Sequence, residues 1–120
     1  LVGFAVDPGD VDHIVGTTPD SLTESTDGGR TWGPMDGPPL AALSWSTDAG
    51  LWGAGTDRAV WRQAQGRWTS TGRLSGEPQA FLVVDAALYA AVQDADGVTE
   101  IVESLDRGRT WQVRYRDTAA

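Results

Sequence analysis

The feature that most constrains this chain is an eight-residue pattern that occurs twice. Residues 25–32 and residues 104–111 both read S-x-D-x-G-R-T-W. A degraded third copy lies between them at residues 62–68, where the glycine, arginine and tryptophan remain but Ala64 stands in the aspartate position. Self-similarity at intervals of tens of residues indicates a structure assembled from similar units.

Short segments rich in β-branched and apolar residues surround each copy of the pattern, and proline, glycine and aspartate separate them. They are too short for helices, which average about 11 residues, and their composition is typical of strands. We therefore expect strands at residues 1–6, 13–18, 21–25, 31–35, 41–45, 51–54, 59–63, 67–71, 79–84, 88–93, 98–104 and 110–115.

Four short strands per repeat predict the blades of a β-propeller. The expected fold is all-β, a single partial propeller over residues 1–120 with three four-stranded antiparallel blades at about residues 1–36, 40–72 and 78–116. Large aromatic side chains are usually buried. We expect five of them to pack between blades: Trp52 and Tyr89 in second strands, and Trp32, Trp68 and Trp111 where fourth strands open.

A propeller needs at least about four blades to close, and the sequence predicts three. Blade faces left open at both ends would expose more apolar surface than a monomer usually tolerates. One hypothesis is a homodimer, in which blade one of each copy meets blade three of the other in a six-bladed ring. The alternative is that the chain belongs to a longer propeller, which would suit a sequence that begins Leu1-Val2-Gly3-Phe4 inside an apolar pattern.

Composition argues against several classes of partner and chemistry. The 120 residues carry a formal charge of −8, which disfavours nucleic acid, and no apolar run approaches the ~20 residues of a membrane helix. The absence of cysteine excludes thiol catalysis and zinc–thiolate sites. His13 is the only histidine. We therefore predict no metal site and no cofactor.

The motif S-x-D-x-G-x-T-W resembles the Asp-box, or BNR, repeat of sialidases and related bacterial propellers. The resemblance covers nearly the whole chain and implies a β-propeller in an extracellular or cell-envelope protein. The motif residues are expected to be structural, because a turn carboxylate accepts backbone hydrogen bonds and glycine permits positive φ. They are Ser25, Asp27, Gly29, Thr31, Trp32, Ser104, Asp106, Gly108, Thr110 and Trp111. Ala64 in the third copy suggests that the carboxylate is useful rather than compulsory.

The same resemblance implies that ligands bind at the opposite end of the blades from these turns. The connections expected there are residues 18–20, 33–40, 55–58, 72–78 and 94–97. Among them, Asp57 and Arg58 stand in one connection and Arg73 and Glu77 in the next. We take these four as candidate ligand-binding residues, although solvated loop charges are common.

Three functions remain open on the sequence. The favoured hypothesis is a non-catalytic binding scaffold for a protein or glycan partner. The alternative is a fragment or subunit of a sialidase-like glycoside hydrolase, and a third, from the resemblance alone, is an assembly factor that holds partner proteins. A sialidase requires three clustered arginines, a tyrosine nucleophile with a glutamate, and a general acid. Tyr89 and Tyr115 are the only tyrosines, and no complete set stands out, so catalytic residues are unassigned.

Overall fold

The computed structural model describes residues 3–117 and contains twelve strands. Within these residues the chain is all-β, without a helix. The strands are β1 (Gly3–Asp7), β2 (Asp10–Thr17), β3 (Leu22–Ser25), β4 (Gly33–Met35), β5 (Leu40–Ser46), β6 (Gly50–Gly55), β7 (Ala59–Ala64), β8 (Arg67–Arg73), β9 (Glu77–Val84), β10 (Ala87–Gln93), β11 (Thr99–Ser104) and β12 (Gln112–Asp117).

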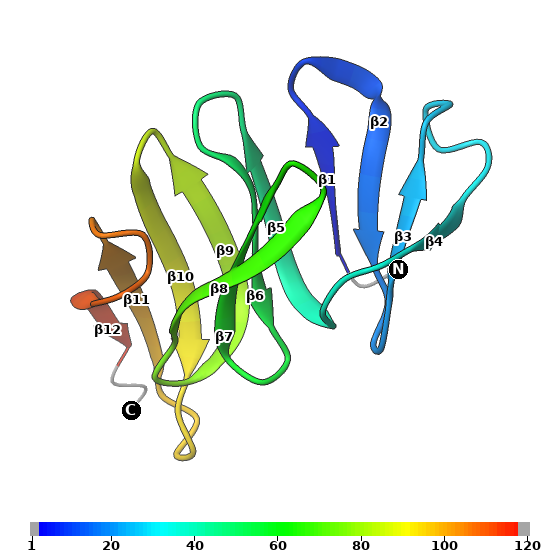
Figure 1. Ribbon diagram of the computed structural model, residues 1–120. Helices are drawn as coiled ribbons and strands as arrows, with labels where there is room; N and C mark the ends of the chain where they lie inside the picture. Colours follow the sequence, from blue (N-terminus) through cyan, green and yellow to red (C-terminus); the bar gives the residue numbers. More distant parts are fainter. Residues whose placement is uncertain (1–2, 118–120) are drawn as a thin grey trace.

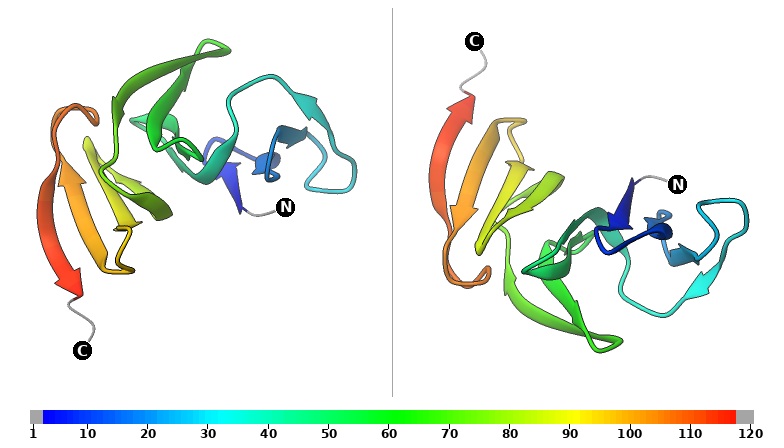
Figure 2. Two further views of the ribbon diagram at one scale, coloured as in Figure 1. Left: turned by 90° about the horizontal axis from the view of Figure 1, so that it is seen from below. Right: turned by 90° about the horizontal axis from the view of Figure 1, so that it is seen from above.

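The strands form three separate antiparallel sheets of four, each in sequence order: β1–β4, β5–β8 and β9–β12. We call these sheets blades one, two and three. The first strands β1, β5 and β9 lie next to one another, and the fourth strands lie on the outside of the arc that the blades form (Figure 2). The expected fold of three four-stranded blades is therefore confirmed.

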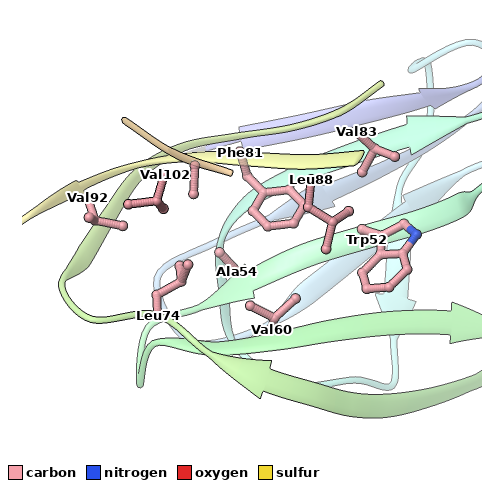
Figure 3. Packing of buried hydrophobic residues seen from close by; sticks show 10 residues of the cluster. Trp52, Ala54, Val60, Leu74, Phe81, Val83, Leu88, Val92 and Val102 are labelled. Atoms are coloured by element: carbon pink, nitrogen blue, oxygen red, sulfur yellow. The ribbon is translucent and has the colours of Figure 1, made fainter. Parts of the chain in front are cut away.

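Two hydrophobic clusters join the blades. Ala5, Val15 and Leu22 of blade one pack against Leu43 and Leu51 of blade two. On the other side of blade two, a second cluster of ten buried residues fills the space before blade three (Figure 3). Because side chains of a strand alternate between the two faces of its sheet, blade two contributes side chains from one face to the first cluster and from the other face to the second.

The second cluster shows how the two blades interlock. Trp52, Ala54 and Val60 project from blade two toward Phe81 and Leu88 of blade three (Figure 3). Trp52 is only 3% exposed, so the expectation that it packs between blades is confirmed.

The connections alternate between the two ends of the sheets. The β1–β2, β5–β6, β9–β10 and repeated β3–β4 and β11–β12 turns lie at the upper end in Figure 1. We call this the turn face. The β7–β8 hairpin lies at the same end, because β5 to β8 are antiparallel in sequence order. The other connections, including those with the four candidate ligand-binding residues, lie at the opposite end.

The degraded third copy is not a repeated turn, which corrects the expectation from sequence. Ala64 pairs with Arg67 across a two-residue hairpin. Gln65 and Gly66 both have positive φ, 53° and 77°, as a tight twisted hairpin requires. A two-residue connection is too short to form the carboxylate-centred turn. The alanine at position 64 is therefore no evidence that the turn can form without its carboxylate.

The aromatic expectations hold only in part. Trp32 is 39% exposed, whereas Trp111 packs partly against the cluster between blades two and three. Trp68 packs against the cluster between blades one and two, and its indole donates to the Asp36 carbonyl at 3.2 Å. Tyr89 is half-buried on the outward face of blade three. Trp32 is exposed because no blade lies beside that side of blade one within the described residues.

Candidate functional site

The two repeated turns have the same hydrogen-bonded structure. Asp27 accepts from the Thr31 N–H at 2.9 Å and from the Thr31 hydroxyl at 2.5 Å. The Ser25 hydroxyl donates to Asp27 at 2.8 Å and accepts from the Gly29 N–H. The Trp32 indole closes the turn by donating to the Gly29 carbonyl at 3.0 Å.

Blade three repeats this arrangement residue by residue. Asp106 accepts from the backbone and hydroxyl of Thr110 and from Ser104, while Trp111 donates to the Gly108 carbonyl. In each turn the threonine hydroxyl, the threonine N–H and the serine hydroxyl lower the pKa of the aspartate to about 2. A carboxylate held this strongly in its charged form suits a fixed turn rather than proton transfer at neutral pH.

Only the turn of blade three is pressed against another blade. Gly108 is buried, and a Cβ there would approach Thr71 and Val60 of blade two, each at 3.2 Å. A Cβ on Gly72 would collide with the Gly108 carbonyl. The repeated turn therefore closes the seam between blades two and three by direct backbone approach.

The four candidate residues on the opposite end have unequal surroundings. Arg58 forms an ion pair with Glu77 at 3.2 Å, and both side chains are exposed. Asp57 caps its own turn by accepting from the Ala59 N–H at 3.1 Å. Arg73 is exposed at the end of β8, beside the bond from the Leu74 N–H to the Arg58 carbonyl. The structure thus joins Arg58 with Glu77, while Asp57 already has a backbone partner.

A hollow lies on the turn face, where the sequence predicted no ligand site. It has two adjoining parts of about 400 and 380 Å³ between blades two and three, which share Arg62 and Arg107. We call the two parts together the interblade groove. Its lining comprises Asp48, Ala49, Trp52, Arg62, Ala64, Thr69, Ser70, Thr71, Asp85, Ala86, Leu88, Leu105, Arg107 and Arg109.

Sequence reasoning missed the interblade groove because its members come from turns and strands of two blades. One signal was present: Arg109 repeats Arg30 in the motif, and Arg107 adds a second arginine where the first copy has Gly28. In the structure, that turn lies against β7 and β8. None of the four residues on the opposite end lines the groove.

A Tyr–Glu–Arg contact lies on the outward face of blade three. The Tyr89 hydroxyl donates to Glu103 at 2.6 Å, and Arg114 approaches the other oxygen of Glu103 at 3.5 Å. The hydrogen bond to Glu103 raises the pKa of Tyr89. Tyr89 faces Glu103 across β10 and β11 as Trp52 faces Arg62 across β6 and β7, so this pair holds the position of a contact between blades.

Other chemistry is sparse in residues 3–117. Among these residues, no group of three or more histidine, aspartate or glutamate side chains is arranged so that it could hold a metal ion. The same residues include no helix with the length and apolar character needed to cross a membrane.

Comparison with known proteins supports the fold. No family model matches the chain, and no curated protein matches it. Among solved structures, it is similar to YCF48 in the structure described as "YCF48 bound to D1 peptide", at 19% identity and a TM-score of 0.69. The match covers 93% of this chain and 40% of the other. The chain therefore spans less than half the length of that protein and shares its β-propeller fold.

Proposed function

We propose that this chain is a non-catalytic propeller scaffold that binds a segment of a protein partner. The observation that carries the proposal is the interblade groove, an open hollow with an aromatic side chain and several arginines and no paired acid and base. The similar structure of YCF48 holds a peptide, by its description, which favours a protein partner over a glycan.

Peptide binding can be tested by selecting a random peptide library on the immobilised protein. Ala86 is exposed at the rim of the groove, so Ala86→Trp should fill the entrance and weaken the selected peptides at least about tenfold. Ser75→Trp, an exposed position at the opposite end, is the matched control and should leave binding unchanged. Failure to enrich any peptide, or equal binding by both variants, would contradict the proposal.

We further infer that the repeated turns are of the Asp-box type. Their serine, aspartate, threonine and tryptophan contacts recur in both copies. The sialidase alternative has less support, because the Tyr89–Glu103 pair lies at a blade-to-blade position and, in the described residues, the arginine that pairs with Glu103 is Arg114. Turnover of a fluorogenic sialoside that is lost in Tyr89→Phe would favour the enzyme. An extracellular or cell-envelope location stays a prediction from the resemblance.

The two outer blade faces have the character of blade interfaces. Phe4, Leu43 and Phe81 occupy equivalent positions, since they pair with Gly16, Gly53 and Ala90. Leu43 and Phe81 are 8% and 7% exposed, whereas Phe4 is 63% exposed. Within residues 3–117, a preceding blade covers Leu43 and Phe81, and none covers Phe4.

The far side of blade three shows the complementary pattern. Leu22, Val60 and Ile101 are equivalent through their pairing with Thr17, Ala54 and Ala91. Leu22 and Val60 are buried, but Ile101 is 40% exposed. We propose that a second copy covers both faces, with blade three of each chain against blade one of the other, as in a six-bladed ring.

Sedimentation analysis tests this pairing. We expect a particle of twice the chain mass of 12.7 kDa, and dissociation in Phe4→Asp and Ile101→Asp. Val11→Asp is the control. Val11 is exposed, but strand alternation places it on the opposite face of blade one from Phe4 and its partner Gly16. A concentration-independent mass of one chain would contradict a second copy and leave further blades of a longer chain as the cover.

A further inference from the structure

The interblade groove contains arginines that the rest of the protein does not neutralise. Within residues 3–117 the arginine ion pairs involve Arg58, Arg114 and Arg116. Arg62, Arg107 and Arg109 have no carboxylate partner there, although the chain carries 17 acidic residues against nine arginines. Arg30, Arg67 and Arg73 also lack an ion pair in these residues, so the distinguishing feature of the other three is that they line one groove. Three positive charges gathered in one groove favour an external anion there.

Arg62 is held in position by blade two. Its guanidinium carbon lies 5.7 Å from the ring centroid of Trp52, in the range of a cation–π contact. The Arg62 Nε is buried without a hydrogen-bond partner, and so is the Thr71 hydroxyl, which lines the same part of the groove. A buried polar atom without a hydrogen-bond partner destabilises the fold. A ligand acceptor that received hydrogen bonds from these two donors would therefore be bound more strongly.

Arg107 and Arg109 come from the repeated turn of blade three. Arg107 has φ of 66°, a conformation that the equivalent Gly28 adopts at 76° without a side chain. Blade three thus places a guanidinium where blade one has none. Arg109 corresponds to Arg30, which belongs to the turn of blade one and lies outside the groove.

The groove also has a direction. Its part nearer the inner strands combines Trp52 and Leu88 with Asp48 and Asp85 from the β5–β6 and β9–β10 turns. The other part, toward β8, adds Thr71 and Arg109 and has no acidic residue. An anionic group is therefore repelled at the inner end and attracted at the outer end.

We propose that the interblade groove binds an extended peptide in which an apolar side chain enters beside Trp52 and a following carboxylate meets Arg62, Arg107 and Arg109. This assignment rests on the proposed scaffold function and names its ligand chemistry. Arginine is suited to the task because its planar donors can pair bidentately with a carboxylate. Both blades that form the groove lie within this chain, so the site does not require a second copy.

The test uses a fluorescein-labelled hexapeptide with one phenylalanine followed by two glutamates, and its glutamine counterpart. Fluorescence anisotropy should show tighter binding of the glutamate peptide, and binding should weaken as salt screens the charges. Arg107→Gly and Arg109→Gln should each reduce affinity about fivefold, the scale of one exposed charge pair. Arg107→Gly keeps a residue suited to positive φ, so its fold should persist.

Arg30→Gln is the matched control, because it removes the same residue from the equivalent turn of blade one. Its affinity should equal that of the unmodified protein, and circular dichroism should show that every variant is folded. Equal binding of the glutamate and glutamine peptides, or equal loss in Arg30→Gln and Arg109→Gln, would overturn the carboxylate assignment. The scaffold function would survive that result if library peptides still bound and Ala86→Trp still blocked them.

Discussion

At the scale of single residues, the repeated turns show one carboxylate organising a connection between strands. Asp27 and Asp106 each accept two hydrogen bonds from the threonine four residues later, one from its hydroxyl group and one from its backbone N–H. These contacts are local in sequence, which explains why the residues could be recognised from the pattern alone. Because the pKa of both aspartates is lowered to about 2, the stability that each turn contributes depends on pH.

Asp27→Asn and Asp106→Asn should lower the melting temperature by a few degrees at neutral pH. A carboxylate with a lowered pKa stabilises the fold above its unfolded pKa of about 3.8, and this stabilisation is lost as pH falls toward 2. The difference from the unmodified protein should therefore shrink in acid, as calorimetry from pH 7 to pH 2 can measure. Asp36→Asn is the control, since no hydrogen bond of that side chain occurs in the described residues. A constant difference would contradict the linkage.

Gly72→Ala should destabilise the chain by about 1–3 kcal/mol, the usual cost of forcing extra volume into a packed site. The added Cβ meets the backbone of Gly108, which cannot move like a flexible side chain. Gly33→Ala is the matched control, because nothing lies within 4 Å of its Cβ position. Urea unfolding curves measure both variants, and equal stability would show that the seam tolerates separation.

At the scale of elements, His13 connects three parts of the structure. From β2 it contacts Glu24 of β3 at 2.6 Å and Asp7 at the end of β1 at 3.3 Å. Its ring also packs edge-on against Trp45 of blade two, with centroids 5.1 Å apart. Burial lowers the pKa of His13, but the hydrogen bonds with Glu24 and Asp7 outweigh it and raise the pKa above 6.5.

His13→Gln should remove a pH dependence from stability. A raised histidine pKa contributes stability that is fully present below pH 6.5 and is lost as pH rises through the folded-state pKa. We expect an effect below about 1 kcal/mol, because the partners are partly exposed. Melting temperatures from pH 5 to pH 9 should fall with pH in the unmodified protein relative to the variant. Parallel curves would contradict this role.

The elements also show what the sequence could predict. Strand order and blade number followed from short apolar segments and turn residues, which are local signals. The fourth strands begin later than expected, at Gly33 and Gln112, because Thr31 and Thr110 are used in the turns. The 62–68 segment misled because Gly66, Arg67 and Trp68 match the motif by letter but form a tight hairpin.

The interblade groove could not be predicted in the same way. Its arginines come from β7 and from a turn more than forty residues later, so their proximity depends on how two blades stack. The resemblance to sialidases also predicted a ligand site at the opposite end of the blades. Arg58 and Glu77 did prove adjacent, because neighbouring connections at one end of a blade lie close together.

At the scale of the whole molecule, blade two is the common support of both hydrophobic clusters. Leu88→Ala should lower the free energy of unfolding by about 2–5 kcal/mol, because Leu88 is 1% exposed at the centre of one cluster. If the blades unfold together, circular dichroism and tryptophan fluorescence should give coincident urea transitions. Leu105→Ala, an exposed leucine, serves as the control. Separate transitions would show that the blades unfold independently.

The backbone approach of Gly72 to Gly108 has a consequence for how such a molecule can change by gene duplication and recombination. A blade with the repeated turn fits only beside a neighbour whose outer strand has no side chain at the point of contact. Copying blade three next to an arbitrary blade would therefore wedge the pair apart. At this seam, the sequences of the two neighbouring blades must therefore be inherited together, because each supplies one of the two glycines in contact.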